Sequence, residues 1–275
     1  MLVGVTAPDG TLLVPPAAPD VRIVNLSIGD PKRRFAGVVS PWARLLDHYA
    51  FRHRVLFMVS AGNIRDAIEV EGVATYTALE DMDARERTEK VLGAVFANRA
   101  YRKLLSPAEA INALTVGARH SDQLPPEAKG AGHIDRFDAD NFANVSSALG
   151  GGAVRCVKPE ILMDGGRETL QLDVAGDGVV KVKPVPVPGR FFGIGAAAPG
   201  LQGELDRMMN SSGTSPAAAL ATHQALRIEQ ALRSMEGIDV GSAHLAVVLM
   251  GSDATKSATG PLAATNAITG SRFGC

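Results

Sequence analysis

The stretch Val55-Leu-Phe-Met-Val-Ser-Ala-Gly-Asn63 is an apolar run that ends in small and polar residues. Its five leading residues are too few for a helix and are typical of a strand buried in a parallel sheet. Residues 41–54 precede it, with helical spacing of the apolar side chains Trp42, Leu45, Leu46, Tyr49 and Ala50 on one face. Residues 21–28 are predicted to form a mostly buried strand that ends at Gly29-Asp30-Pro31. Strand, helix and strand in this order build a parallel sheet covered by helices.

Further strands and one long helix follow along the chain. Residues 113–118 and 158–163 are short apolar strands, and residues 167–194 alternate in the manner of antiparallel strands. We expect residues 181–188 to be an edge strand or an extended linker, because proline cannot donate to an interior ladder. The long helix covers residues 215–235, and its Ala- and Leu-rich first half should be buried on most sides.

Three segments interrupt this pattern. Residues 64–111 are charged and helix-prone, which predicts a helical insert, a hairpin or lid, with mostly solvated side chains. Residues 120–152 are polar and glycine-rich and are expected to form a long surface excursion. Residues 167–200 are expected to make a strand-rich insert. A last apolar segment covers residues 244–250, and the chain 1–275 is expected to be one domain, near the upper size for a single core.

The composition argues against several partner classes. The chain has 275 residues, 46% of them hydrophobic, and 28 Lys and Arg balance 29 Asp and Glu. This balance gives no reason to expect a nucleic acid or an anionic membrane as partner. No apolar stretch approaches the ~20 residues of a membrane span, and the N-terminus lacks the order of a signal peptide. Only Cys156 and Cys275 occur, so we expect a reducing, cytoplasmic location and no disulfide framework.

The triplet Gly213-Thr214-Ser215 puts a hydroxyl at the first turn of the long helix. Unpaired backbone N–H groups and the positive end of the helix dipole lie at such a turn, and they favour an oxyanion formed when Ser215 attacks a carbonyl. Pro216 suits the first helical position, because its missing N–H would have no helical partner there. Taken alone, Ser215 is more often a simple helix cap, and Ser211, Ser212 and Thr214 compete for that role.

Asn63 follows a predicted parallel strand at its carboxyl end, which is where α/β sheets bind ligands. An Asn after Ala-Gly is also a common turn residue, so this position alone leaves both roles open. The glycines at 150–152 and at 193–200 could suggest phosphate loops. Neither group is followed by Lys and Ser or Thr, so loop flexibility is the favoured interpretation.

Three segments in order, Val24-Asn-Leu-Ser-Ile-Gly29, Val59-Ser-Ala-Gly-Asn63 and Ser212-Gly-Thr-Ser-Pro-Ala-Ala218, resemble the subtilases, the subtilisin-like serine proteases. Weaker matches are Ala113-Leu-Thr-Val-Gly-Ala118, Asn144-Val-Ser-Ser147 with Lys158-Pro-Glu-Ile161, and residues 245–254. The resemblance implies an α/β, three-layer fold with a mainly parallel central sheet flanked by helices, incomplete at the N-terminus, with the helical insert and the antiparallel strand excursion.

The resemblance also assigns roles to residues of the site. Ser215 would be the nucleophile, and the Asn63 amide would donate the second oxyanion hydrogen bond. Ser27, Ile28 and Gly29 would offer backbone groups to an extended peptide, in the manner of strand addition. Ala61 and Gly62 would form part of the wall of the primary specificity pocket. The substrate-binding set is Ser27, Ile28, Gly29, Ala61, Gly62, Gly213 and Thr214.

The Asp and His that subtilases use with their serine have no counterpart among these motifs. Both would precede the match at 24–29, yet only 20 residues precede Val21, the first histidine is His48, and no His-Gly-Thr occurs. Asp9-Gly10 is interpreted as a turn. The chain is therefore interpreted as the C-terminal part of a subtilase domain, its Asp and His lying outside it.

The histidines present are poorly located to act as a base for Ser215. His223 lies eight residues further along the helix, about 12 Å along its axis, which is too far for a hydrogen bond. His48 and His53 are expected at the opposite end of the sheet from Asn63. His120 and His133 are expected in the surface excursion, and His244 opens the last apolar segment. The histidines at 120 and 133 with Asp122, Asp135 and Asp138 could form a metal site, but this spacing is common by chance.

The leading functional hypothesis is a serine endopeptidase that acts on a polypeptide substrate through Ser215 and Asn63, with no cofactor and no metal. The Asp and His would come from a missing N-terminal segment or a complementing chain, so this chain alone should be inactive or very weak. The alternative is a catalytically inactive peptide-binding or scaffold protein. An α/β-hydrolase esterase is disfavoured, because Gly213-Thr-Ser-Pro-Ala217 lacks the final glycine of that nucleophile motif.

Overall fold

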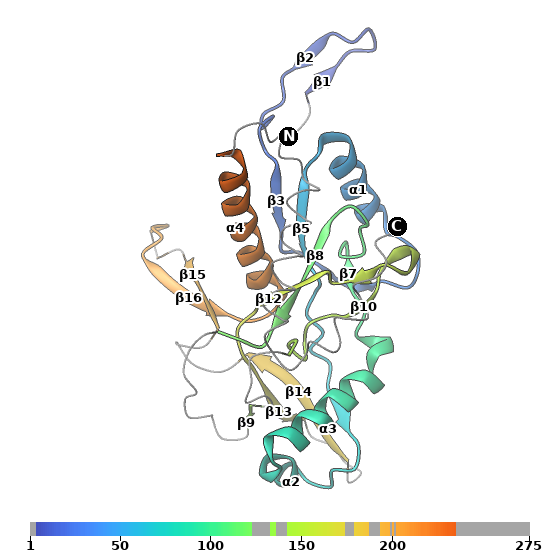
Figure 1. Ribbon diagram of the computed structural model, residues 1–275, viewed down its shortest axis with the longest axis vertical. Coiled ribbons are helices and arrows are strands. Elements are labelled where there is room, and N and C mark those ends of the chain that lie inside the picture. The colour runs from blue at the N-terminus through green and yellow to red at the C-terminus, as the bar shows by residue number, and fades with distance from the viewer. Residues whose placement is uncertain are drawn as a thin grey trace.

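The structure is a computed structural model and describes residues 4–122, 133–135, 142–173, 179–186, 193–198, 200 and 202–234. Four parallel strands form its central sheet, in the order β12-β8-β5-β3 (Figure 1). Their bounds are β3 (Ile23–Leu26), β5 (Leu56–Ser60), β8 (Leu114–Arg119) and β12 (Ile161–Asp164). The predicted mixed α/β fold with a parallel sheet is therefore confirmed.

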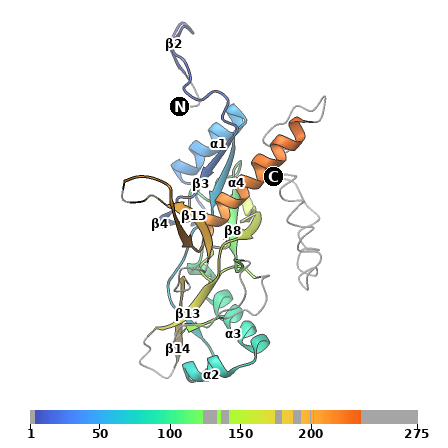
Figure 2. The same cartoon turned by 90° about the vertical axis from the view of Figure 1, so that its left-hand side faces the viewer.

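Two helices cover opposite faces of this sheet, as Figure 2 shows: α1 (Pro41–His53) and α4 (Thr214–Arg233). Alternate residues of β5 point to the two sides, so Phe57 and Val59 pack on the side of α1 and Met58 on the side of α4. The α4 face that meets the sheet consists of Ala217, Ala218, Ala221 and Ala225. These small side chains let the helix lie close to the strands.

The structure corrects two details of the sequence interpretation on the α1 side. Leu45, expected on the buried face of the helix, is 51% exposed, whereas Ala43, Leu46 and Ala50 are the buried residues of α1. Strand β3 is half-buried rather than mostly buried. The reason is that, within the described residues, β3 pairs only with β5 and so lies at an edge of the sheet.

A second packed unit lies beside the central sheet, in the lower part of Figure 1. It is a four-stranded antiparallel sheet in the order β6-β14-β13-β9, covered by two helices. Ile68, Val70, Leu79, Val91 and Leu170 are at most 1% exposed in its core. Its elements are β6 (Ile68–Val70), α2 (Tyr76–Asp81), α3 (Ala84–Ala97), β9 (His133–Ile134), β13 (Glu168–Asp173) and β14 (Val180–Pro186). Segments 64–111 and 167–200 thus contribute strands to one sheet.

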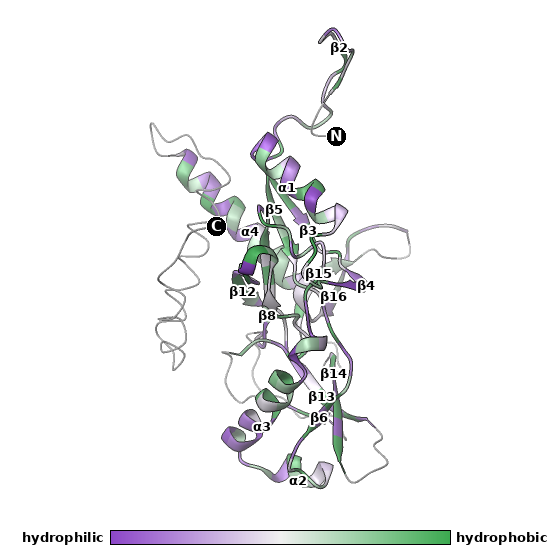
Figure 3. Ribbon diagram, turned by 90° about the vertical axis from the view of Figure 1, so that its right-hand side faces the viewer, coloured by the Kyte–Doolittle hydropathy of each residue, from purple (hydrophilic) through white to green (hydrophobic). Residues whose placement is uncertain are grey.

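The short elements form pairs around these two units: β1 (Val5–Thr6) with β2 (Leu12–Val14), β4 (Asp30–Arg34) with β7 (Leu105–Ser106), β10 (Gly150–Gly151) with β11 (Val157–Lys158), and β15 (Ile194–Ala198) with β16 (Arg207–Ser211). Two single 3₁₀ turns are η1 (Arg99–Tyr101) and η2 (Ala153–Arg155). Figure 3 shows hydrophobic residues along β5 and a mixture of hydrophobic and hydrophilic residues along α1 and α3. No helix of the described part is long and apolar enough to cross a membrane.

The predicted edge or linker character of residues 181–188 is wrong for the first part of β14. Lys181 and Val182 lie between β6 and β13 and pair with both. The prolines of this strand, Pro184 and Pro186, come after the last residue paired with β6 and face a partner only on the β13 side. Both prolines therefore lie in the stretch of β14 that has one neighbouring strand among the described residues, an edge position at which proline is tolerated.

The predicted surface excursion over residues 120–152 is also wrong in part. Residues 144–148 are at most 2% exposed. Their polar groups are buried because they have partners: Ser146 Oγ hydrogen-bonds the carboxylate of Glu168, and Asn144 Nδ2 donates to Gly166 O at 3.0 Å. A buried polar segment is stable only when such partners exist.

Arg102 connects two of these buried segments. Its side chain is 3% exposed, and its Nη2 donates to Ile64 O at 2.6 Å and to the carbonyl of Val145. Burial lowers the pKa of the guanidinium, while Glu168 and Asp66 act in the opposite direction. The guanidinium thereby holds the chain just after Asn63 against the 144–148 segment.

We expect Arg102→Ala to lower the free energy of unfolding by roughly 2–4 kcal/mol, because it leaves two buried carbonyl groups without their charged donor. Urea unfolding followed by circular dichroism measures this loss. The matched control is Arg99→Ala, at an exposed arginine three residues earlier, which should change stability by no more than about 0.5 kcal/mol. Equal effects of the two substitutions would contradict the role given to Arg102.

Candidate active site

Ser215 is the second residue of α4, and the helix starts without a side-chain cap from its own segment. Gly213 is the N-cap residue, with φ of 123°. None of the three expected cap residues caps this helix, and the Ser212 hydroxyl is buried without a hydrogen-bond partner in the described structure. The first N–H of the helix, that of Thr214, instead donates to Asn63 Oδ1 at 2.9 Å.

This bond fixes the orientation of the Asn63 amide. Because Thr214 N–H is a donor, the Asn63 atom that faces it must be the oxygen. The Nδ2 group then has no hydrogen-bond partner among the described residues. The N–H of Ser215 lies in the first helical turn, where no intrahelical acceptor exists, and it too has no partner in the described part of the chain. Two donors, Asn63 Nδ2 and Ser215 N–H, are therefore available at the N-terminus of α4.

The end of β3 also lies against Ser215. Ser215 Oγ donates to Ser27 O at 3.3 Å, and Ser27 Oγ lies 3.1 Å from Ser215 O. Ser27 Oγ is also 2.9 Å from Asn25 Oδ1, and its single proton serves one of these acceptors at a time. The site thus combines the carboxyl ends of β3 and β5 with the N-terminus of α4, as the sequence motifs predict for adjacent parallel strands.

The remaining predicted substrate-binding residues differ in accessibility. Gly62 N–H donates to Thr214 Oγ1 at 3.1 Å, and Gly62 O accepts from Ala148 N at 2.9 Å. Ala61 bonds Val116 O through its N–H and Leu105 N–H through its carbonyl. Ile28 is 56% exposed, and within the described residues the backbone of Ile28 and Gly29 makes no hydrogen bond. Of these four residues, Ile28 and Gly29 are therefore the ones with free backbone groups for an extended ligand.

None of the described histidines hydrogen-bonds the Ser215 hydroxyl. His223 is exposed on α4. On α1, the His48 ring meets the Tyr49 ring edge-on, and the His53 ring lies tilted against it, with ring centroids 5.6 and 5.5 Å from that of Tyr49. His120 is fully buried, which corrects its predicted surface location. Its burial is tolerated because Asp135 Oδ1 lies 3.0 Å from Nε2 and Asn144 Oδ1 lies 3.2 Å from Nδ1.

His133 Nδ1 lies 2.9 Å from Thr169 Oγ1. Asp138, His244, Cys275 and residues 245–254 lie outside the described residues. Among the described side chains no group of three His, Cys, Asp or Glu is arranged to hold a metal ion.

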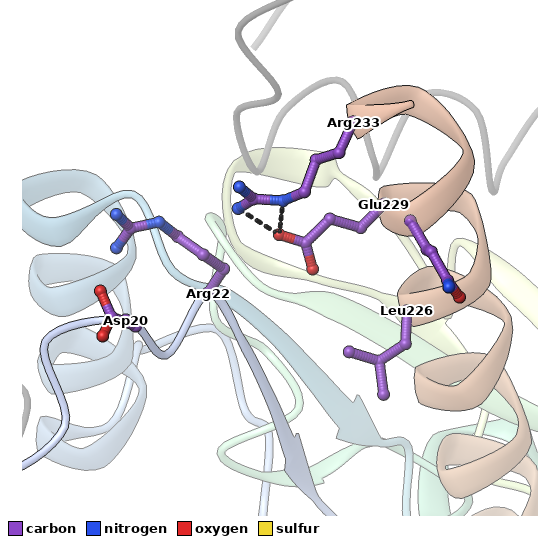
Figure 4. Close-up of a pocket in the computed structure, with 6 residues that line it drawn as sticks. Asp20, Arg22, Leu226, Glu229 and Arg233 are labelled. Atoms are coloured by element: carbon purple, nitrogen blue, oxygen red, sulfur yellow. Dashed lines mark hydrogen bonds and ion pairs between the residues drawn. The ribbon is translucent and has the colours of Figure 1, made fainter. Parts of the chain in front are cut away.

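Two cavities exist away from the Ser215 hydroxyl. One of about 510 Å³ lies between the start of β3 and the last turns of α4, where the Arg22 side chain points toward Asp20 and Arg233 pairs with Glu229 (Figure 4). Ser215 and Ser27 lie at the other ends of the same helix and strand. A second cavity of about 920 Å³ lies between the end of α3 and residues 147–151. Neither cavity is lined by a predicted site residue.

Sequence reasoning missed two residues that shape the site. Ser147 forms a β-bridge with Asn63, and its hydroxyl accepts from Ala118 N at 3.1 Å. Leu105 packs against the backbone of Gly29 and Gly62. Ser147 belongs to one of the weaker motif matches and could have been included on that basis. Leu105 lies in the charged segment 64–111, where no local pattern marks it.

Comparison with known proteins agrees with the motif assignment. The model of the subtilase family matches residues 11–254. The chain is also similar to the uncharacterized protein y4bN of Sinorhizobium fredii (strain NBRC 101917 / NGR234), with 33% identity over 154 residues, 53% of this chain. The match spans 31% of that protein's length. Since the family match extends over most of the chain, from β2 to beyond α4, the protein belongs to the subtilase family.

Proposed function

We propose that Ser215 is the nucleophile of a serine endopeptidase site with Asn63 as its oxyanion partner. Membership of a family of serine peptidases supports this in general terms. The observation that carries the proposal is the bond from Thr214 N–H to Asn63 Oδ1, at 2.9 Å. It turns the Asn63 amide so that its N–H₂ group and the Ser215 N–H remain as two unused donors at the N-terminus of α4.

The reaction would be acyl transfer. Ser215 Oγ attacks the carbonyl carbon of a peptide bond, and the carbonyl oxygen becomes an oxyanion that accepts hydrogen bonds from Ser215 N–H and Asn63 Nδ2. The positive end of the α4 dipole adds to this stabilisation. The C–N bond then breaks, the amine leaves with a proton, and water hydrolyses the acyl ester to release the acid and restore the serine.

The proton of Ser215 needs an acceptor that the described residues do not supply. In the family pattern this base is a His held by an Asp, and we propose that both come from residues outside the described part or from a complementing chain. Without them, only oxyanion stabilisation and binding remain, which typically leaves about 10³–10⁴-fold acceleration over water. The substrate is a polypeptide, whose extended backbone would pair with the free backbone groups of Ile28 and Gly29.

A second candidate function is peptide binding without cleavage. It is favoured by one contact: the Ser215 hydroxyl donates its proton to the Ser27 carbonyl, which cannot act as a base at neutral pH. The two candidates share the same groove and differ in whether Ser215 reacts.

A fluorescent fluorophosphonate tests the reactivity of Ser215. We expect slow labelling of the chain that is abolished by Ser215→Ala and slowed about 10²–10³-fold by Asn63→Ala, because the phosphonyl oxygen needs the same donors as an oxyanion. Ser211→Ala, an exposed serine of β16, is the matched control and should label like the native chain. In-gel fluorescence over time gives the rates.

Labelling that persists in Ser215→Ala, or that is unchanged in Asn63→Ala, would contradict the nucleophile and oxyanion assignments respectively. A Ser215 that never labels, in a chain that still binds peptides, would favour the second candidate.

Gly213→Ala tests the close approach between α4 and Asn63. A Cβ at this position would lie 2.6 Å from Asn63 Oδ1, and φ of 123° is strained for any other residue. We expect a loss of about 2–4 kcal/mol in unfolding free energy, because the backbone strain is added to the loss of the hydrogen bond from Thr214 N–H to Asn63 Oδ1. We also expect slower labelling of Ser215.

Gly37→Ala is the control, since Gly37 has φ of 95° but no atom within 4 Å of the added Cβ. It should cost about 1–2 kcal/mol from strain alone and leave labelling unchanged. If both substitutions had the same cost and the same labelling rate, the contact with Asn63 would not matter.

A further inference from the structure

We propose that Leu105 fills the space that would receive the substrate side chain next to the cleaved bond, so that the site selects glycine or alanine there. This inference rests on the proposed function, because it assumes that a peptide carbonyl is presented to Ser215. It adds the substrate class, which neither the family nor the y4bN similarity specifies.

Leu105 is held between the two backbone segments that flank the nucleophile. Its N–H donates to Ala61 O at 3.1 Å, and the strand it starts, β7, pairs with β4 through Asp30 and Ser106. One bond thus attaches Leu105 to the segment after β5, and the other pairing attaches it to the segment after β3. The side chain is 4% exposed.

The glycines of both segments contact this one side chain. A Cβ at Gly29 would lie 3.1 Å from Leu105 Cβ, and a Cβ at Gly62 would lie 2.5 Å from Leu105 Cγ and 2.7 Å from Cδ1. Gly62 also has φ of 105°, so a larger residue there would be strained as well. The two glycines therefore present bare backbone walls, and the isobutyl group of Leu105 occupies the space between them.

Consider a peptide that pairs with Ile28 and Gly29 and directs the carbonyl of its cleaved bond to Ser215. The side chain of the residue that carries this carbonyl then lies against the same two backbone walls. With Leu105 between them, a hydrogen or a methyl group fits without displacement, whereas a leucine or phenylalanine side chain must move Leu105 out of a packed position. Closely packed protein interiors resist the insertion of a larger side chain. Pockets that differ by one or a few methylene groups discriminate about 10–200-fold between substrates.

Binding of fluorescein-labelled Ala-Ala-Ala-Xaa amides to the full chain, with Xaa as Gly, Ala, Leu or Phe, tests the inference by fluorescence anisotropy. The native chain should bind the Gly and Ala peptides at least about tenfold more tightly than the Phe peptide. Leu105→Ala should raise affinity for the Phe peptide at least about tenfold and leave affinity for the Ala peptide nearly unchanged.

Leu104→Ala is the matched control. Leu104 is 1% exposed in the same core cluster, but it is not among the nearest neighbours that a Cβ at Gly29 or Gly62 would meet. It should keep the native selectivity. Leu105→Ala removes a buried side chain and could unfold the protein. Leu105→Val removes only one methylene group and should still improve binding of the Leu peptide. Circular dichroism checks that each variant is folded.

The inference is overturned if the native chain binds the Phe peptide as tightly as the Ala peptide, if Leu105 and Leu104 variants have the same selectivity, or if no variant binds any of the four peptides. Fluorophosphonate labelling separates this failure from failure of the proposed function. If Ser215 is labelled as expected but the chain does not select the Gly and Ala peptides, only the Leu105 inference fails. A selectivity shift with an unreactive Ser215 supports the groove and defeats acyl transfer.

Discussion

The hydrogen bond from Thr214 N–H to Asn63 Oδ1 joins the first turn of α4 to the chain that leaves β5, and the geometry of the candidate site depends on it. It satisfies a helix N–H that would otherwise lack an acceptor, and it decides which way the Asn63 amide points. A second bond, from Gly62 N–H to Thr214 Oγ1, connects the same two segments. Gly213 is required at this junction because a side chain there would collide with the Asn63 amide.

Local patterns predicted the parallel sheet because its strands are short apolar runs that only a doubly covered sheet can bury. All five residues of the run at 55–59 are buried, and its last four form most of β5. The same reasoning failed for β3, since its burial depends on how many strands lie beside it and not on its own sequence. It also failed for Asn144 and His120, because the partners that make their burial tolerable come from residues distant in the chain.

For the site, the ordered motifs named Ser27, Asn63 and Ser215. In the structure Ser215 Oγ hydrogen-bonds Ser27 O, and Asn63 hydrogen-bonds Thr214, the residue before Ser215. The expected serine cap of α4 was replaced by an acceptor from another strand, which no local pattern reveals. Arg102 and Leu105 were missed for a related reason. Both lie in a stretch whose composition indicates a solvated helix, yet each ends up buried against the backbone next to Asn63.

The alanine stripe of α4 has a mechanical consequence. Because Ala217, Ala218, Ala221 and Ala225 have no rotatable side chain, their methyl groups are fixed to the helix backbone, and a displacement at this contact can be absorbed only by side-chain torsions on the sheet side. Any shift of α4 along its axis would move Ser215 by the same amount. The position of the Ser215 hydroxyl relative to Asn63 therefore depends on how the whole helix packs on the sheet.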